Sequence, residues 1–94
     1  MSYVFFDLEW NQGYPHSVED KLDEIIQIGA CCLEQWDSQP EPFSCYVRPT
    51  IHKKLHHRVR KMLPLDMDTL KQADGFRAAA RKFFQWCGSD PVFF

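Results

Sequence analysis

The chain has 94 residues and a formal net charge of −2, so it has room for one small domain and carries no strong overall charge. With 45% hydrophobic and 15% aromatic residues, it is too apolar for a disordered chain. No apolar run approaches the roughly 18 residues of a membrane span, and the first residues lack the cationic start of a secretory signal. We therefore expect a cytoplasmic protein with no membrane segment.

Three strands are predicted in the first half of the chain. Residues 3–6 are β-branched or aromatic and continue into Leu8, which is typical of a strand buried on both faces. Residues 24–33 are the second predicted strand, and residues 43–48 are the third. The connections are polar or rich in turn formers: residues 11–15, 17–23 and 37–42. Strands joined in this way predict an antiparallel meander.

The second half is predicted to be mainly helical. Apolar residues at helical spacing allow a short helix within residues 51–62, and Asp66 is a suitable N-cap for another that ends near Leu70. The clearest helix covers residues 75–87. Its apolar side chains form one stripe: Phe76, Ala79, Ala80, Phe83, Phe84 and Cys87. Residues 91–94 begin a further apolar strand, so the predicted fold class is α/β.

Opposite charges are separated along the chain. Up to residue 42 there are nine carboxylates and a single cation, Lys21. Residues 48–61 contain no acid but nine basic side chains: Arg48, His52, Lys53, Lys54, His56, His57, Arg58, Arg60 and Lys61. This asymmetry indicates an anionic, metal-attracting region beside a surface able to meet phosphates; a solvated basic face is the equally weighted alternative.

Two carboxylates, Asp7 and Glu9, lie at the end of the first predicted strand. Residues two apart on a strand project from the same face. Carboxylates held this close repel each other unless a cation lies between them, and Mg²⁺ or Mn²⁺ prefers oxygen ligands. The spacing alone is common, so surface carboxylates remain the alternative until the surrounding sequence is considered.

That surrounding sequence resembles the DnaQ-like, DEDD-type 3′→5′ exonucleases, most closely the DEDDh group. Residues 4–10, VFFDLEW, are similar to the first exonuclease motif, an apolar strand that ends in D-x-E. Residues 23–30, DEIIQIGA, look like the family's second strand. Residues 43–49, with the closing Arg-Pro, and the helix at 75–87 resemble the third strand and the first long helix. The blocks follow the family's order over nearly the whole chain.

The resemblance implies a partial ribonuclease H-like fold: a three-stranded antiparallel meander, a helix and the start of a fourth strand. It implies hydrolysis of phosphodiester bonds at the 3′ end of DNA or RNA by a two-metal site that holds Mg²⁺ or Mn²⁺. Asp7 and Glu9 would be catalytic metal ligands. Leu8, through its peptide group, and Trp10, by stacking, would bind the terminal nucleotide of the substrate.

The family's chemistry uses four carboxylates and a His base, and this chain departs from that pattern. The second-motif Asp follows the strand after the first long helix, and the His and last Asp come later. We expect residues 1–94 to be the N-terminal part of a single exonuclease domain, truncated before that Asp, with an incomplete metal site and no activity of its own. Asp90 precedes the strand and is not assigned to this role.

Three alternatives remain open at this stage. The chain is a non-catalytic nucleic-acid-binding or regulatory half-domain that uses residues 48–61, or it self-associates through the edge strand that ends at Phe94. A zinc site at His52, His56 and His57 is the least favoured reading, because no Cys or carboxylate is close in sequence. None of these histidines is placed as the family's general base.

Overall fold

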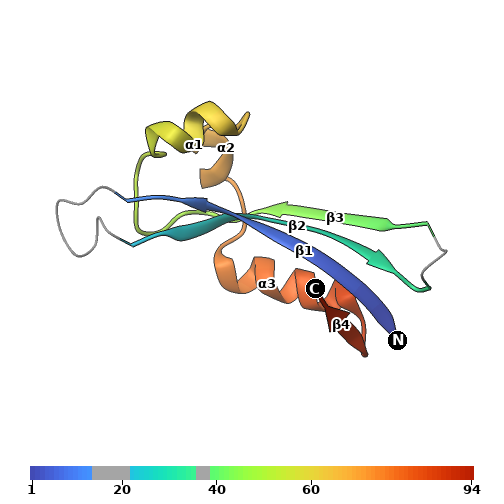
Figure 1. Ribbon diagram of the computed structural model, residues 1–94. Helices are drawn as coiled ribbons and strands as arrows, with labels where there is room; N and C mark the ends of the chain where they lie inside the picture. Colours follow the sequence, from blue (N-terminus) through green and yellow to red (C-terminus); the bar gives the residue numbers. More distant parts are fainter. Residues whose placement is uncertain (14–21, 36–38) are drawn as a thin grey trace.

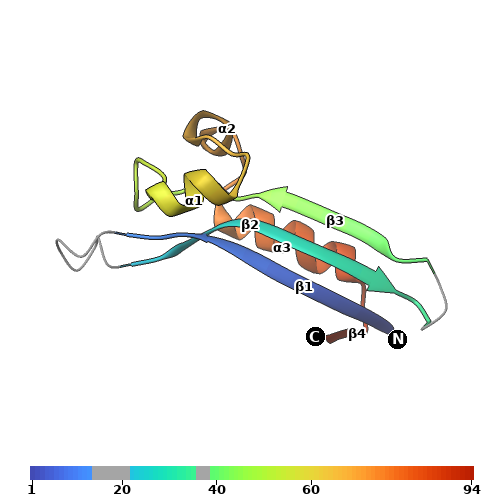
Figure 2. The same ribbon diagram turned by 45° about the horizontal axis from the view of Figure 1, so that its top comes forward.

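Four strands and three helices make up the part of the chain that the structure, a computed structural model, describes: residues 1–13, 22–35 and 39–94. The strands are β1 (Ser2–Asn11), β2 (Glu24–Leu33), β3 (Glu41–Tyr46) and β4 (Pro91–Phe93). The helices are α1 (His57–Met62), α2 (Met67–Lys71) and α3 (Phe76–Cys87). Figures 1 and 2 show α1 and α2 together near the end of β3, whereas α3 runs alongside the sheet.

The sheet has the strand order β3-β2-β1-β4. β1, β2 and β3 pair antiparallel, which confirms the predicted meander, and β4 returns parallel to β1 after the helical segment. A parallel return needs a long crossover, and the residues between β3 and β4 supply it with three helices. The α/β fold class is confirmed, and β4 is an edge strand that pairs with β1.

One face of the sheet packs against α3. Val4 on β1 is opposite Cys32 on β2, and both are buried in one cluster with Ala79, Phe83 and Cys87 of the helix. These helical positions are spaced by four residues, so they form the buried stripe of α3. Removing a side chain the size of Phe83 from water contributes about 1.5–3 kcal/mol, so this stripe is a major part of what holds the helix on the sheet.

A second cluster of buried residues joins α1 and α2 to the start of β2. Ile26 is fully buried against Leu55, Val59 and Leu70, which come from the loop before α1, from α1 and from α2. Helices of five and six residues are too short to be stable alone in water. This apolar contact therefore determines the position of α1 and α2, and with them that of the basic residues before and within α1.

Helix α3 begins and ends where the sequence predicts, but its stripe is narrower. Gly88 has φ +83°, in the left-handed region that ends a helix at glycine. Phe76 and Phe84 remain 54% and 58% exposed, so their assignment to the apolar stripe is wrong. Phe84 makes an edge contact with Phe93 of β4, at 6.3 Å between ring centroids, and is still mostly exposed.

Two other boundaries differ from the prediction. β3 covers residues 41–46 rather than 43–48, because the Arg48 amide donates to the carbonyl of Asp74 instead of to the sheet. Within residues 51–62 only 57–62 are helical. Consequently His52 and His56 do not lie on one helical face, although the four-residue spacing between them would allow it in a longer helix.

Part of each of the three predicted connections lies outside the described residues, and the connection at 11–15 is described only up to residue 13. The loop at 17–23 is described only at its last two positions, and the turn at 37–42 only from residue 39. Within the described part of the chain, no helix is long and apolar enough to cross a membrane.

Candidate functional site

Asp7 and Glu9 project from the face of β1 that is turned away from α3. Their Cα partners on β2 are Gly29 and Gln27, whereas Leu8 between them packs against the α3 cluster. Asp7 is exposed and Glu9 is half-buried. The sequence predicted both residues at the end of the first strand. β1 instead continues past them to Asn11, so they lie within the strand.

A hydrogen bond and a glycine define the surroundings of Asp7. The Oδ1 atom of Asp7 accepts a hydrogen bond of 3.0 Å from the Leu8 amide, which orients the carboxylate. Gly29, directly across the ladder, presents no side chain, and a Cβ built there would lie 3.9 Å from the nearest atom, the Asp7 carbonyl oxygen. Packing of the described residues therefore does not require this glycine.

The donor set fits part of a divalent-cation site. Two carboxylates on one face are the hard oxygen ligands that Mg²⁺ and Mn²⁺ prefer. Within residues 1–13, 22–35 and 39–94, no group of three or more His, Cys, Asp or Glu side chains is arranged to hold a metal. Asp7 and Glu9 could therefore supply two oxygen ligands to such a cation.

The two predicted substrate-binding residues lie differently. The Leu8 side chain faces the core, so its peptide group alone is available to a ligand on the carboxylate face. Trp10 is 46% exposed and follows a register shift between Glu9 and Trp10. Such an irregularity turns a side chain relative to regular alternation and is frequent beside active sites. The roles of Leu8 and Trp10 stay predictions.

Asn11, the last residue of β1, holds the basic loop. Its side chain is fully buried, donates from Nδ2 to the Lys54 carbonyl at 3.2 Å, and accepts from the His56 amide at 2.9 Å. One amide group therefore satisfies an acceptor and a donor of the loop. Two residues after Glu9, the strand is thus tied to the segment that carries the positive charge.

Glu24 holds the preceding part of the same loop. Its Oε2 atom accepts from the amides of Thr50 and Ile51 at 3.0 and 3.1 Å, and Oε1 accepts from the amide of His52 at 3.0 Å. Three consecutive backbone amides of the loop are thus held by one carboxylate. Glu24 is also the Cα partner of Asn11 in the ladder, so one cross-strand pair holds residues 50–56.

The histidines of this segment have structural partners. The Nε2 atom of His52 lies 2.6 Å from the Leu22 carbonyl. His56 is the N-cap of α1: its Nδ1 atom accepts from the Arg58 amide at 3.1 Å, and its ring stacks on His57 at 4.3 Å. Burial, followed by the nearby charges of His57 and Arg58, lowers the pKa of His56.

Asp66 is the N-cap of α2, as predicted. Its Oδ1 atom accepts from the Thr69 amide at 2.8 Å, and the hydrogen bonds from Thr69 lower the pKa of Asp66. This carboxylate is therefore committed to the helix.

Asn11 and Glu24 were not recognised from the sequence as anchors of the loop. Asn11 reads there as a turn former, and Glu24 as the first residue of a strand. Their partners are 26 to 45 positions away in the chain, so no local pattern signals the contact. A polar residue directly after an apolar strand was the one available hint.

Comparison with known proteins matches this arrangement to a family. A model of the RNase T exonuclease family matches residues 4–93. The chain belongs to this exonuclease family. No protein with a curated description matches significantly. The resemblance to DnaQ-like exonucleases is thereby confirmed for nearly the whole chain.

Solved structures show the same fold. A full-length 3′-exonuclease is similar with a TM-score of 0.74 and 22% identity over 92% of this chain and 38% of its own. The nuclease domain of 3′hExo, a DEDDh family member bound to rAMP, has a TM-score of 0.74 and 19% identity over 98% and 50%. Cell-death related nuclease 4 has a TM-score of 0.74 and 21% identity over 98% and 33%. This chain spans between a third and a half of their length.

We expect Asn11→Ala to destabilise the protein by about 1–3 kcal/mol, because it leaves a carbonyl and an amide of the loop without their buried partner. Chemical unfolding followed by circular dichroism measures the loss. Gln12→Ala removes a neighbouring exposed amide side chain and is the control. Equal stability of the two variants would show that Asn11 does not anchor the loop.

We also expect stability to fall as the pH is lowered through the range of His56. Because its pKa is lowered on folding, the unfolded chain binds a proton first, near the ordinary value of 6.5. The contribution is therefore complete above that pH and is lost as pH falls through the folded-state value, where Nδ1 can no longer accept from Arg58. Unfolding experiments at several pH values compare wild type with His56→Asn, which keeps an N-cap acceptor without titrating. An unchanged pH profile in the variant would contradict this role.

Proposed function

We propose that this chain supplies the N-terminal, metal-binding part of a 3′→5′ exonuclease domain that acts on nucleic acid. The observation that carries the proposal is the placement of Asp7 and Glu9 on one face of β1, in a chain whose residues 4–93 match the exonuclease family. One similar structure is described as 3′-end specific recognition of a histone mRNA stem-loop by a 3′-exonuclease, and another is bound to rAMP. RNA is therefore the first substrate to test.

In this proposal Asp7 and Glu9 hold divalent cations, Mg²⁺ or Mn²⁺, of a two-metal site. Bound metal in such sites activates water and stabilises negative charge on the phosphoryl oxygens. Asp7, the more exposed of the pair, would hold a bound ion through its carboxylate. Glu9 binds from the adjacent position on the same face, and the Leu8 peptide and the Trp10 ring position the terminal nucleotide.

We further propose that residues 1–94 do not cleave nucleic acid alone. Two oxygen ligands leave most of the coordination sphere of Mg²⁺ or Mn²⁺ to water, so they neither fix two ions nor orient a nucleophile. Within the described residues no third ligand is near. In this proposal the chain is one part of a domain, and further sequence supplies the remaining metal ligands. We also propose that the protein is located in the cytoplasm.

We expect Mn²⁺ to bind weakly to the chain, with a dissociation constant on the order of 10⁻⁴ M or weaker, as in sites with few charged ligands. Isothermal titration calorimetry measures the affinity, and Asp7→Asn and Glu9→Gln should each abolish binding. Glu34→Gln removes an exposed carboxylate at the far end of β2 and is the control. Tight binding of two ions, or binding that survives Asp7→Asn, would contradict the proposed half-site.

Self-association through β4 is a second proposal, which a specific observation favours. β4 lies at the edge of the sheet. Its residue Phe93 has ring contacts with Phe6 and Phe84, and all three side chains are more than 40% exposed. An open edge next to exposed apolar side chains invites pairing with another chain.

We expect the average mass measured by light scattering to rise with protein concentration, and Phe93→Lys to suppress the rise. Phe76→Lys changes an equally exposed Phe at the other end of α3 and is the control. A mass that stays monomeric at high concentration would remove the proposal.

A further inference from the structure

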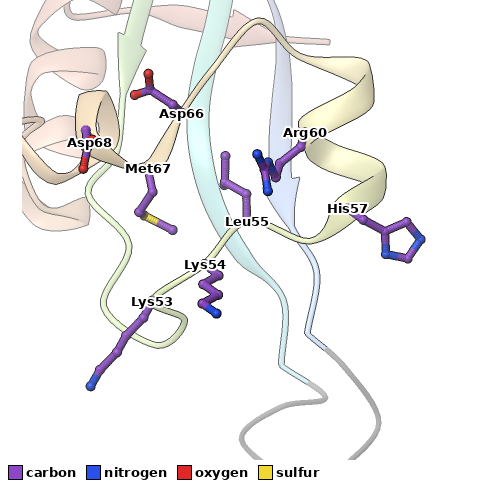
Figure 3. Close-up of a pocket in the computed structure, with 8 residues that line it drawn as sticks. All are labelled: Lys53, Lys54, Leu55, His57, Arg60, Asp66, Met67 and Asp68. Atoms are coloured by element: carbon purple, nitrogen blue, oxygen red, sulfur yellow. The ribbon is translucent and has the colours of Figure 1, made fainter.

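The structure divides the basic stretch into side chains that share a pocket and side chains that do not. Lys53, Lys54 and Arg60 line a pocket of about 360 Å³ between the loop, α1 and the start of α2 (Figure 3). Arg48 lies outside it, with Nη1 3.4 Å from the Ala73 carbonyl beside α3. Arg58, although it is on α1, does not line the pocket either. A general charged surface would not gather part of a charge run in this way.

The lining combines three kinds of chemistry. Leu55 lies at the centre of the pocket in Figure 3 and is almost fully buried, and Met67 is half-buried beside it. The cations come from the loop and α1, whereas the carboxylates of Asp66 and Asp68 come from the α2 side. In Figure 3 the Arg60 guanidinium points toward Leu55, whereas Lys53 and Lys54 extend away from it. Apolar, cationic and acceptor groups in one lining match the base or sugar, the phosphate and the amino or hydroxyl groups of one nucleotide. The volume falls within the range of small-ligand sites.

The pocket is fixed in place next to the carboxylate strand. The Lys54 carbonyl is bound by Asn11, which is two residues, or about 7 Å of strand, beyond Glu9. Leu55 belongs to the buried cluster that joins α1 and α2 to β2. The backbone that carries the cations is therefore held by β1 and β2, and the side chains of Lys53, Lys54 and Arg60 are left exposed to solvent.

We propose that this pocket binds one nucleotide of a single-stranded nucleic acid, with Lys53, Lys54 and Arg60 at its phosphate, upstream of the 3′ end that lies at Asp7 and Glu9. The inference rests on the proposed function, since it takes the carboxylates as the place of the 3′ end. It adds a site that carries no metal and takes no part in hydrolysis. It also gives the path of the nucleic acid, which approaches past the end of β1 and over the loop and α1.

Binding of a labelled single-stranded oligonucleotide to the chain, measured by fluorescence anisotropy in EDTA over a series of salt concentrations, tests the site without any metal. We expect Lys54→Gln combined with Arg60→Gln to weaken binding about tenfold and to make the slope of log K against log salt shallower by up to roughly 0.7, because one neutralised phosphate on a single strand contributes about 0.7. The matched control is Arg58→Gln with Lys61→Gln, which removes the same charge from the same segment outside the pocket.

Each outcome decides the inference. A smaller loss in the control pair than in the pocket pair supports the site; equal losses in the two pairs, or no binding by wild type at low salt, would overturn it. A mononucleotide that displaces the oligonucleotide at equal concentration would show a site for free nucleotides and would also overturn it. If Mn²⁺ binds through Asp7 and Glu9 while the two pairs are equal, the proposed function stands without this pocket. If pocket-dependent binding occurs without Mn²⁺ binding, the pocket stands as a nucleic-acid site and the proposed metal-binding function does not.

Discussion

The cross-strand pair of Asn11 and Glu24 is the constraint on which the arrangement of this molecule depends. The two residues face each other at the end of the β1–β2 ladder, and both direct their side chains at the backbone of residues 50–56. Hydrogen bonds to a charged acceptor contribute about 1.5–3 kcal/mol each, and a buried partner that is left unpaired costs a similar amount. Because Asn11 and Glu24 hold backbone groups of the loop, the side chains of Lys53 and Lys54 stay exposed to solvent.

This anchoring brings opposite charges together at one end of the sheet. The acidic first half of the chain and the basic segment are separate in sequence, but Asn11 binds the segment two residues beyond Glu9. Carboxylates on the strand favour a cation, and cations on the loop favour phosphate, so the two regions would suit the metal ions and the nucleic acid that we propose as ligands. At physiological salt such fields act over about 8 Å, so this proximity matters for function.

The strands and the long helix were predictable from the sequence because their signals are local. Alternation and β-branched residues mark β1 and β2, and the spacing of Ala79, Phe83 and Cys87 marks α3. The segment between β3 and α3 was not predictable to the same degree. Its apolar spacing allows a helix over residues 51–62, but Asn11, far away in sequence, binds the Lys54 carbonyl and the His56 amide, which such a helix would need for its own hydrogen bonds. Sequence periodicity carries no record of such a distant competitor.

The candidate metal site and the packing of the sheet are incomplete on the same face. α3 covers one side of β1 and β2, whereas Asp7 and Glu9 project from the other, among half-buried apolar residues such as Phe5 and Cys31. The ring of Phe94 stacks on that of Phe5, with centroids 4.9 Å apart. Further oxygen ligands for a metal held by Asp7 and Glu9 therefore have to arrive over this face. An element that packs on its apolar part would bury Phe5 and Cys31 and, by the same contact, hold those ligands close to the carboxylates.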